Sequence, residues 1–315
     1  MKVFGPVPSR RLGRSVGVNN IPAKICTYSC VYCQLGRSLQ MTIDRQAFYA
    51  PEELQTEVTK KINRLTALGE DVDYLTIVPD GEPTLDVNLG QLLELLRPLN
   101  IKLAVITNSS LIHLPEVRAA LAKADWVSLK VDAVDVEIWK KIDRPHGQLE
   151  LQRILEGMLS FAGQFKGLLV TETMLVKNVN DHPQQLKRVA EFIRMLKPET
   201  AYLSIPTRPP AENWVAPPDE SALNTAFQIF SDQGINTEYL IGYEGNRFAF
   251  TGDVEQDILS ITAVHPMRED AVFAYLQKAG RSFGAIEKLI ADGKLIVREY
   301  QNKKYFLRRL QKTKK

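Results

Sequence analysis

The chain has 315 residues, of which 44% are hydrophobic and 24% are charged, as expected for a folded protein with one large and one small domain. This composition excludes intrinsic disorder and collagen-like structure. No apolar stretch approaches the ~18 residues that a membrane-spanning helix needs, and the N-terminus lacks the apolar core of a secretory signal. We therefore expect a cytoplasmic protein with no membrane partner.

The formal net charge is +3, but the charge is unevenly distributed. Residues 253–315 contain 13 lysines and arginines against 8 acidic residues, and from Lys278 onward the ratio is 12 to 3. This asymmetry indicates a near-neutral body with a basic C-terminal piece. Nucleic acid is the usual partner of such a piece, and a solvated basic tail is the alternative.

A strand is expected at residues 15–20, followed by a loop that contains all three cysteines. From residue 45 to about 205, helical and strand-like patterns then alternate. The first helix has Pro51 and acidic residues in its first turn, followed by apolar residues at helical spacing. We predict helices at 51–65, 89–96, 115–123, 149–161 and 182–196, and strands at 74–78, 101–106, 126–131, 168–176 and 201–205.

These strands are short and almost continuously apolar, which is typical of a parallel sheet buried on both faces by helices. About six strands are too few for a complete eight-fold barrel and enough for an open one. We predict an α/β fold, a partial (β/α)6 TIM-like barrel, for residues 1–252. A doubly wound sheet is the alternative, because periodicity does not separate the two.

The proline-rich stretch at 206–218 is predicted to be a loop, which could serve as a lid or a crossing segment. A helix at 221–233 and a strand at 237–241 close the first domain. A turn at 242–246 and a strand at 247–250 follow.

Residues 253–315 are predicted to form a separate small domain. Helices at 254–261, 268–276 and 282–290, followed by strands at 294–300 and 305–310, have the order of a winged helix. The third helix and the hairpin carry the candidate phosphate contacts, which are Arg281, Lys288, Lys303, Lys304, Arg308 and Arg309.

The three cysteines, Cys26, Cys30 and Cys33, have the spacing C-x3-C-x2-C. Three thiolates can bind three irons of a [4Fe–4S] cluster, and the fourth iron then keeps an open position, as at a catalytic metal site. The alternatives are a redox dithiol, which leaves Cys26 unexplained, a zinc site completed by a histidine, and a chance cluster. An odd number of cysteines this close argues against structural disulfides and favours a reducing compartment.

This motif, with the aromatic Tyr32 before the third cysteine, resembles the radical S-adenosylmethionine (SAM) enzymes over about residues 5–245. The resemblance implies a partial (β/α)6 barrel and a [4Fe–4S] cluster whose open iron chelates SAM. In these enzymes one electron cleaves SAM, and the resulting 5′-deoxyadenosyl radical abstracts hydrogen from a substrate. It also implies an electron donor such as flavodoxin or ferredoxin.

Further motifs follow the predicted strands. Residues 80–84 (DGEPT) resemble the family's G-G-E-P motif, with Asp80 in place of the first glycine, and Thr107-Asn108 resembles its T-N segment. Polar residues in buried strands need partners, and a structural ion pair is the alternative for Lys130, Asp132 and Glu172. The resemblance implies as cofactor-binding residues Tyr32, Gly81, Glu82, Asn108, Ser128, Lys130, Asp132, Glu172 and Ser204.

Residues 5–19 and the segment 34–36 resemble a branch related to the tRNA-wyosine-synthesising enzymes, which build a tricyclic base on a guanosine of tRNA from pyruvate. The archaeal type uses a second cluster, for which this chain has no cysteines left, so we carry over the radical chemistry alone. Candidate anion contacts are Arg10, Arg11, Arg14, Arg144 and His146.

Three functions are consistent with the sequence, and none assigns a catalytic residue. The leading hypothesis is a radical SAM enzyme that modifies RNA, with tRNA as the expected substrate bound through residues 253–315. The second is a radical SAM enzyme that acts on a peptide, a protein or a small metabolite. The third is an iron–sulfur redox sensor that binds DNA, and it is the weakest because a sensor needs no SAM-binding strand ends.

Overall fold

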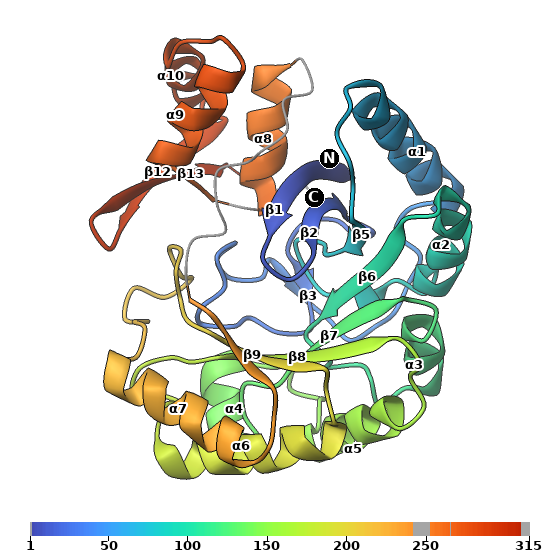
Figure 1. The fold of residues 1–315 in the computed structure, drawn as a ribbon, viewed down its shortest axis with the longest axis vertical. Helices are drawn as coiled ribbons and strands as arrows, with labels where there is room; N and C mark the ends of the chain where they lie inside the picture. The colour runs from blue at the N-terminus through green and yellow to red at the C-terminus, as the bar shows by residue number, and fades with distance from the viewer. Residues whose placement is uncertain (1, 242–252, 265, 310–315) are drawn as a thin grey trace.

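The computed structural model describes residues 2–241, 253–264 and 266–309. Its main element is an eight-stranded sheet in the order β1-β2-β5-β6-β7-β8-β9-β10, which curls into an open barrel (Figure 1). Only β1 is antiparallel to its neighbour. The strands are β1 (Val3–Ser9), β2 (Gly13–Val18), β5 (Tyr74–Ile77), β6 (Lys102–Thr107), β7 (Trp126–Lys130), β8 (Leu168–Met174), β9 (Thr200–Ser204) and β10 (Thr237–Leu240).

The order of the strands decides between the two predicted architectures. From β2 to β10 each strand pairs with the next strand of this sheet along the chain, whereas a doubly wound sheet reverses its order at a switch point. The two edge strands, β1 and β10, are not paired with each other. The partial barrel is therefore confirmed, and the doubly wound alternative is excluded.

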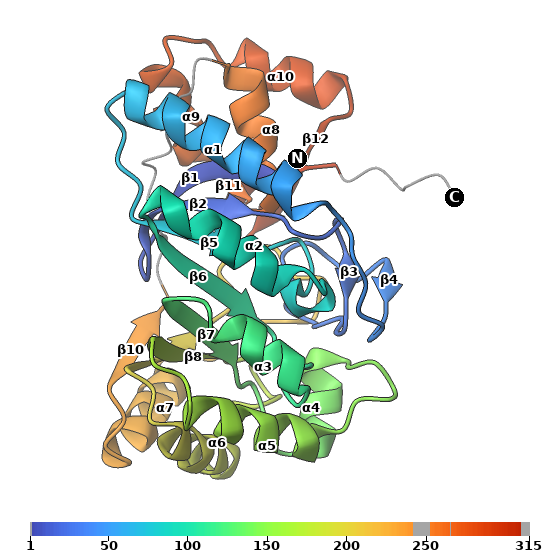
Figure 2. The ribbon, with the colours of Figure 1, turned by 90° about the vertical axis from the view of Figure 1, so that its right-hand side faces the viewer.

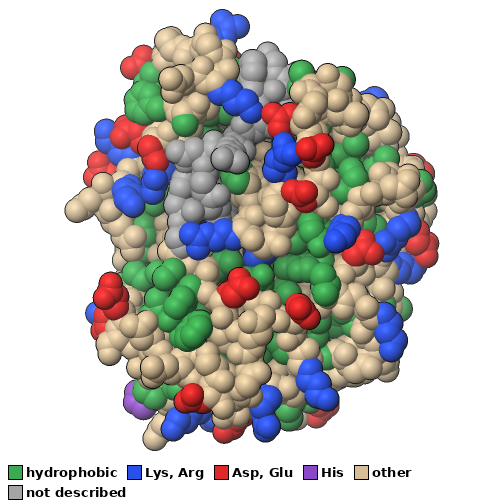
Figure 3. All heavy atoms as spheres, in the orientation of Figure 1, with side chains coloured by type: hydrophobic (Ala, Val, Ile, Leu, Met, Phe, Trp, Pro, Cys, Tyr) green, Lys and Arg blue, Asp and Glu red, His purple; other side chains and the backbone are tan. Residues whose placement is uncertain are grey.

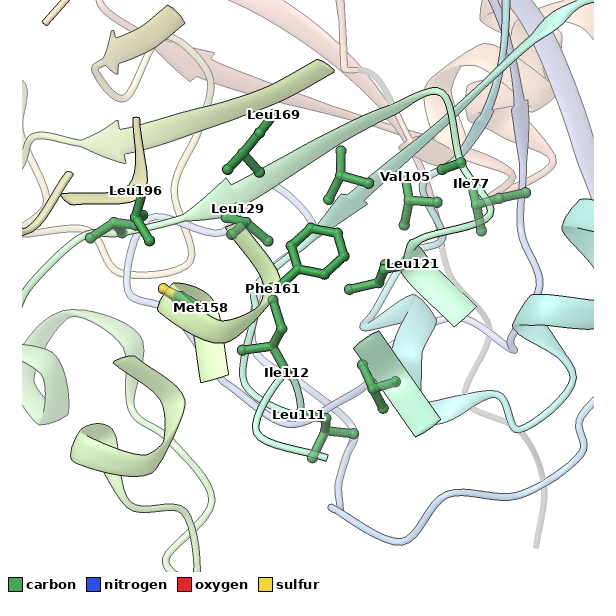
Figure 4. Close-up of a cluster of buried hydrophobic side chains, with 14 of the residues drawn as sticks. Ile77, Val105, Leu111, Ile112, Leu121, Leu129, Met158, Phe161, Leu169 and Leu196 are labelled. Carbon is green, nitrogen blue, oxygen red and sulfur yellow. The ribbon is translucent and has the colours of Figure 1, made fainter. Parts of the chain in front are cut away.

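Helices cover the outer face of the curled sheet (Figure 2). Strand residues such as Val105, Leu129 and Leu169 point outward against Phe161 and other apolar helix side chains (Figure 4). Removing this apolar surface from water supplies the main stabilisation of the barrel. The covering helices are α1 (Pro51–Ala67), α2 (Leu89–Leu96), α3 (Pro115–Leu121), α5 (Leu151–Ala162), α6 (Pro183–Leu196) and α7 (Glu220–Asp232).

Several elements were not predicted. Helix α4 (Val136–Asp143) begins where the Asp135 side chain accepts the backbone N–H groups of Glu137 and Ile138, which is a typical N-cap. The edge strand β1, the short pair β3 (Ile25–Cys26) and β4 (Gln40–Met41), and two 3₁₀ turns, η1 (Pro83–Leu85) and η2 (Arg97–Leu99), were also missed. The predicted turn at 242–246 and strand at 247–250 lie outside the described residues.

Residues 253–264 and 266–309, called here the C-terminal unit, have a separate apolar cluster that includes Tyr275, Ile286 and Phe306. Their three-stranded sheet has the order β11-β13-β12. The winged-helix identity of this unit and the division into 1–252 and 253–315 stay predictions. The elements are α8 (Val254–Val264), β11 (Met267–Arg268), α9 (Glu269–Lys278), α10 (Gly284–Ala291), β12 (Leu295–Tyr300) and β13 (Lys303–Arg308).

The C-terminal unit lies beside β1 and over the proline-rich segment (Figure 1), and this segment has no helix or strand from 206 to 218, as predicted. The Tyr300 hydroxyl donates to the Pro206 carbonyl at 2.9 Å, and the Tyr305 hydroxyl donates to the Thr207 carbonyl at 3.0 Å. Two backbone carbonyls that directly follow β9 therefore hold the hairpin. No helix within the described ranges is long and apolar enough to span a membrane.

Gly157 offers a test of the packing between α5 and the turn after β6. A Cβ atom there would lie 2.7 Å from backbone atoms of His113. We expect Gly157→Ala to lower the free energy of unfolding by about 1–2 kcal/mol, because overpacking outweighs the gain in helix propensity. Chemical denaturation would measure this. The control is Gly163→Ala at the end of the same helix, where the new Cβ would lie 3.6 Å from the nearest atom, the carbonyl oxygen of Leu159. Equal stability of the two variants would contradict the close packing at Gly157.

Candidate functional site

A cavity of about 370 Å³ lies at the carboxyl ends of the parallel strands, the edge at which parallel βα proteins bind ligands. The loop that follows β2 closes one side of it. Two predicted cofactor-binding residues, Ser128 and Asp132, lie outside its lining. The lining contains the three cysteines and the other predicted residues, which are Tyr32, Gly81, Glu82, Asn108, Lys130, Glu172 and Ser204.

Glu82, after β5, joins two strand ends. Its Oε1 accepts hydrogen bonds from the Thr84 hydroxyl at 2.6 Å, the Thr84 backbone N–H at 3.0 Å and the Thr107 hydroxyl at 2.6 Å. Its Oε2 accepts the backbone N–H of Asn108 at 2.8 Å. Burial raises the pKa of this carboxyl, and the four donors oppose the shift. Glu82 therefore shapes the cavity by fixing the backbone at the ends of β5 and β6.

Gly81 allows the β5 end to touch the start of the cysteine loop. A Cβ at this position would overlap the carbonyl oxygen of Ile25, and the neighbouring Glu82 N–H donates to that same oxygen at 3.2 Å. The Lys24 N–H donates to the Asp80 carbonyl at 2.6 Å. Only glycine permits so close an approach of two backbones, which accounts for the glycine of the DGEPT motif.

All three cysteines line the cavity. Burial raises the pKa of Cys26 to about 12, and it also raises the pKa of Cys30 and of Cys33. A metal would displace these protons, because the thiolate is the ligand. No three potential ligands of the described residues converge on a single ion. A cluster differs from a single ion in this requirement, because each thiolate then binds a different iron.

A charged network crosses the cavity from the sheet to the cysteine loop. Glu172 on β8 pairs with Lys130 at 2.8 Å and with Arg11 at 2.5 Å, and it accepts the Ser204 hydroxyl at 3.0 Å. Although burial opposes it, the positive charges of Lys130 and Arg11 lower the pKa of Glu172. The ammonium of Lys130 lies 5.0 Å from the centre of the Tyr32 ring. The ion pair that the sequence left as an alternative is thus present, and its members also line the cavity.

Asp132 and Ser128 lie behind this lining. Asp132 is buried and accepts the Tyr32 hydroxyl at 2.5 Å and the Met174 N–H at 2.6 Å. It therefore positions Tyr32, while Ser128 is buried within β7. For both residues the cofactor contact stays a prediction.

Sequence reasoning missed Asp143, which ends α4. The Cys30 thiol donates to its Oδ1 at 3.4 Å, and burial next to Asp132 raises the pKa of Asp143 well above its usual range. Of the predicted anion contacts, Arg11 lines the cavity. Arg14 and Arg144 do not line it, and they form ion pairs with carboxylates outside the cavity.

Asp80, where the family motif has glycine, also lines the cavity. It is 5% exposed, and its Oδ1 has no hydrogen-bond partner in the described part of the chain. Burial raises its pKa to about 7 against the opposing charges of Arg308 and Lys24. A buried carboxylate oxygen without a donor favours a cationic ligand, and SAM carries both a sulfonium and an ammonium group.

The arrangement of this cavity agrees with the comparisons. Residues 20–193 match the family model of the radical SAM superfamily. A UPF0026 protein of Methanocaldococcus jannaschii is 47% identical over 309 residues, which cover 98% of this chain and 96% of that protein.

Two solved structures share the fold. A radical SAM methyltransferase from Sphaerobacter thermophilus has a TM-score of 0.55 at 15% identity, with 72% of this chain and 66% of that chain covered. TYW1 with a lysine–pyruvate adduct bound has a TM-score of 0.52 at 14% identity, with 70% and 73% covered.

The chain belongs to the radical SAM superfamily, whose members use a [4Fe–4S] cluster and SAM, and the resemblance predicted from the cysteine motif is confirmed. Within the superfamily, the chain is similar to the UPF0026 protein of Methanocaldococcus jannaschii over nearly its whole length. The residues of the cavity fit both groups, because three cysteines line it and Asp80, whose Oδ1 has no described partner, belongs to the same lining. The individual ligand assignments stay predictions.

We expect Cys30→Ala to lose the cluster while the barrel remains folded, since its core lies elsewhere. Anaerobic reconstitution should give about four irons per chain in the unmodified protein and far less in the variant. Iron analysis and circular dichroism measure the two properties. A variant that keeps its iron and still forms 5′-deoxyadenosine would show that Cys30 is no ligand.

We expect Asp80→Asn to change how the stability of the cofactor-free protein depends on pH. Folding raises the pKa of Asp80 from 3.8 to about 7, so the folded state holds the proton more tightly. Stability is then lost as pH rises from about 4 to 7. In the variant this loss should disappear, and melting temperatures from pH 4.5 to 8 would measure it. Parallel curves for the two proteins would contradict the assignment.

Proposed function

We propose that this protein is a radical SAM enzyme that modifies RNA, with tRNA as the expected substrate. When bound, the cluster and SAM supply a 5′-deoxyadenosyl radical that abstracts hydrogen from the substrate. Lys130, Glu172 and Arg11 orient polar groups in the cavity, and the cysteine loop limits access of water. An electron donor such as flavodoxin or ferredoxin and a cytoplasmic location belong to the same proposal.

One observation supports RNA over the other substrates. The basic C-terminal unit is anchored by Tyr300 and Tyr305 to residues that line the cavity, Pro206 and Thr207. A nucleic acid held by this unit would therefore lie next to the cavity. The resemblance of residues 5–19 to the wyosine-synthesising branch supports the same substrate class.

We expect tRNA to stimulate formation of 5′-deoxyadenosine several-fold when reconstituted enzyme is incubated with SAM and a reductant. The physical reason is that a bound substrate gives the radical a hydrogen atom to abstract. Liquid chromatography of the nucleoside product, with mass analysis of the digested tRNA, would measure the reaction.

The Cys30→Ala variant is the control for chemistry that does not depend on the cluster. Stimulation by an RNA-free metabolite or peptide extract, without any by tRNA, would replace this proposal with the second function. Absence of SAM cleavage under all conditions would favour the iron–sulfur regulator.

A further inference from the structure

A second cavity of about 610 Å³ lies where the C-terminal unit meets the barrel. Three segments of the chain line it: the cysteine loop, the proline-rich segment and the strands β12 and β13. It has lining residues in common with the first cavity, namely Lys24, Gln34, Leu35 and Gly36. The two cavities therefore adjoin along one stretch of the cysteine loop.

The lining of the second cavity is strongly cationic. It contains Lys24, Arg37, Arg298, Arg308 and Arg309. The one acidic residue of the lining within the described ranges is Glu212. Its carboxylate already pairs with Arg37 at 2.7 Å and with Arg144 at 2.5 Å. The remaining cations of the lining form no ion pair with a described carboxylate.

This distinguishes the cavity from the rest of the C-terminal unit. Lys278, Lys288 and Lys304 are ion-paired to Glu70, Glu255 and Glu269, respectively. Basic and acidic side chains are interleaved over the face drawn in Figure 3. Arg298, Arg308 and Arg309, by contrast, have no carboxylate partner among the described residues. Of the cations of this unit without such a partner, these three line the cavity, whereas Arg281 and Lys303 lie outside it.

Lys24 lines both cavities, and its backbone is fixed by hydrogen bonds on both sides. Its backbone has a φ of 64°, a left-handed conformation that costs energy in a lysine. Its N–H donates to Asp80, and its carbonyl accepts the N–H groups of Leu39 and Gln40. Arg308 on the other side is half-buried, and its charge opposes the rise in the pKa of Asp80. Cations of the second cavity therefore act electrostatically on the wall of the first.

We infer that the second cavity binds phosphate groups of a nucleotide substrate and thereby presents the rest of that substrate to the first cavity. Guanidinium groups match phosphate oxygens in pairs, and the cavity supplies three of them next to a lysine. The inference rests on the proposed function, in which the phosphates belong to RNA. A free nucleotide offers the same chemistry, and the test below separates the two sources.

The experiment compares two double variants of the reconstituted holoenzyme. Arg298→Gln with Arg309→Gln removes two exposed cations from the cavity lining. Arg153→Gln with Arg194→Gln removes two arginines from exposed positions on helices α5 and α6, outside both cavities. Fluorescence anisotropy with labelled tRNA, and separately with labelled GTP, is measured at several salt concentrations. Iron content and melting temperature show that each variant is folded.

We expect the cavity variant to bind tRNA at least tenfold more weakly. The slope of log K against log salt concentration should become smaller by about one to two, since about one counterion is released per phosphate contact. The control variant should bind within about twofold of the unmodified protein. If both variants bound tRNA equally well, the second cavity would not be the phosphate site, while the proposal of RNA modification would stand.

Two further outcomes distinguish phosphate binding in the second cavity from RNA modification. Binding of GTP but not tRNA, lost in the cavity variant alone, would support a phosphate site and overturn RNA as the substrate. Binding of neither probe to the unmodified holoenzyme would overturn both.

Discussion

A single buried carboxylate fixes the geometry on which the site depends. Glu82 connects the ends of β5 and β6 through four hydrogen bonds, and the glycine before it lets the cysteine loop lie against the same backbone. Without Glu82, its buried donors would each lack an acceptor, at a cost of about 1–3 kcal/mol apiece. The position of the three thiols relative to the sheet is thereby coupled to one side chain.

The parallel sheet and the edge that carries the site were predictable, because continuous apolar strands and polar residues at their ends are local patterns. Strand β1 was not, since Pro6 and Pro8 argue against a strand and are tolerated here at a sheet edge. Helix α4 was missed, although α2 and α3 are no longer than it and were predicted; its Asp135 N-cap is the signal that could have revealed it. Lys130 and Glu172 of the charge network were predicted as site residues. The ion pair of Glu172 with Arg11 was not, because it joins residues 161 positions apart that only the curvature of the open sheet brings together.

The C-terminal charge shows a similar limit. Counting lysines and arginines predicts a basic unit, yet the count does not reveal which charges are neutralised by ion pairs. Lys288 and Lys304 were predicted as phosphate contacts and each has a carboxylate partner. Arg298 was not predicted as a phosphate contact, and it lines the second cavity. Local sequence determines how much charge a unit carries, whereas tertiary contacts determine where it remains available.

The attachment of the hairpin has a consequence for how this protein can vary. Tyr300 and Tyr305 donate to backbone carbonyls at 206 and 207, and every amino acid supplies such a carbonyl. Substitutions in the segment that follows β9 can therefore alter the side chains at the rim of the cavity without breaking the attachment. For these two hydrogen bonds the phenol groups are the only side chains required, so the rim is free to diversify for different substrates while both bonds are kept.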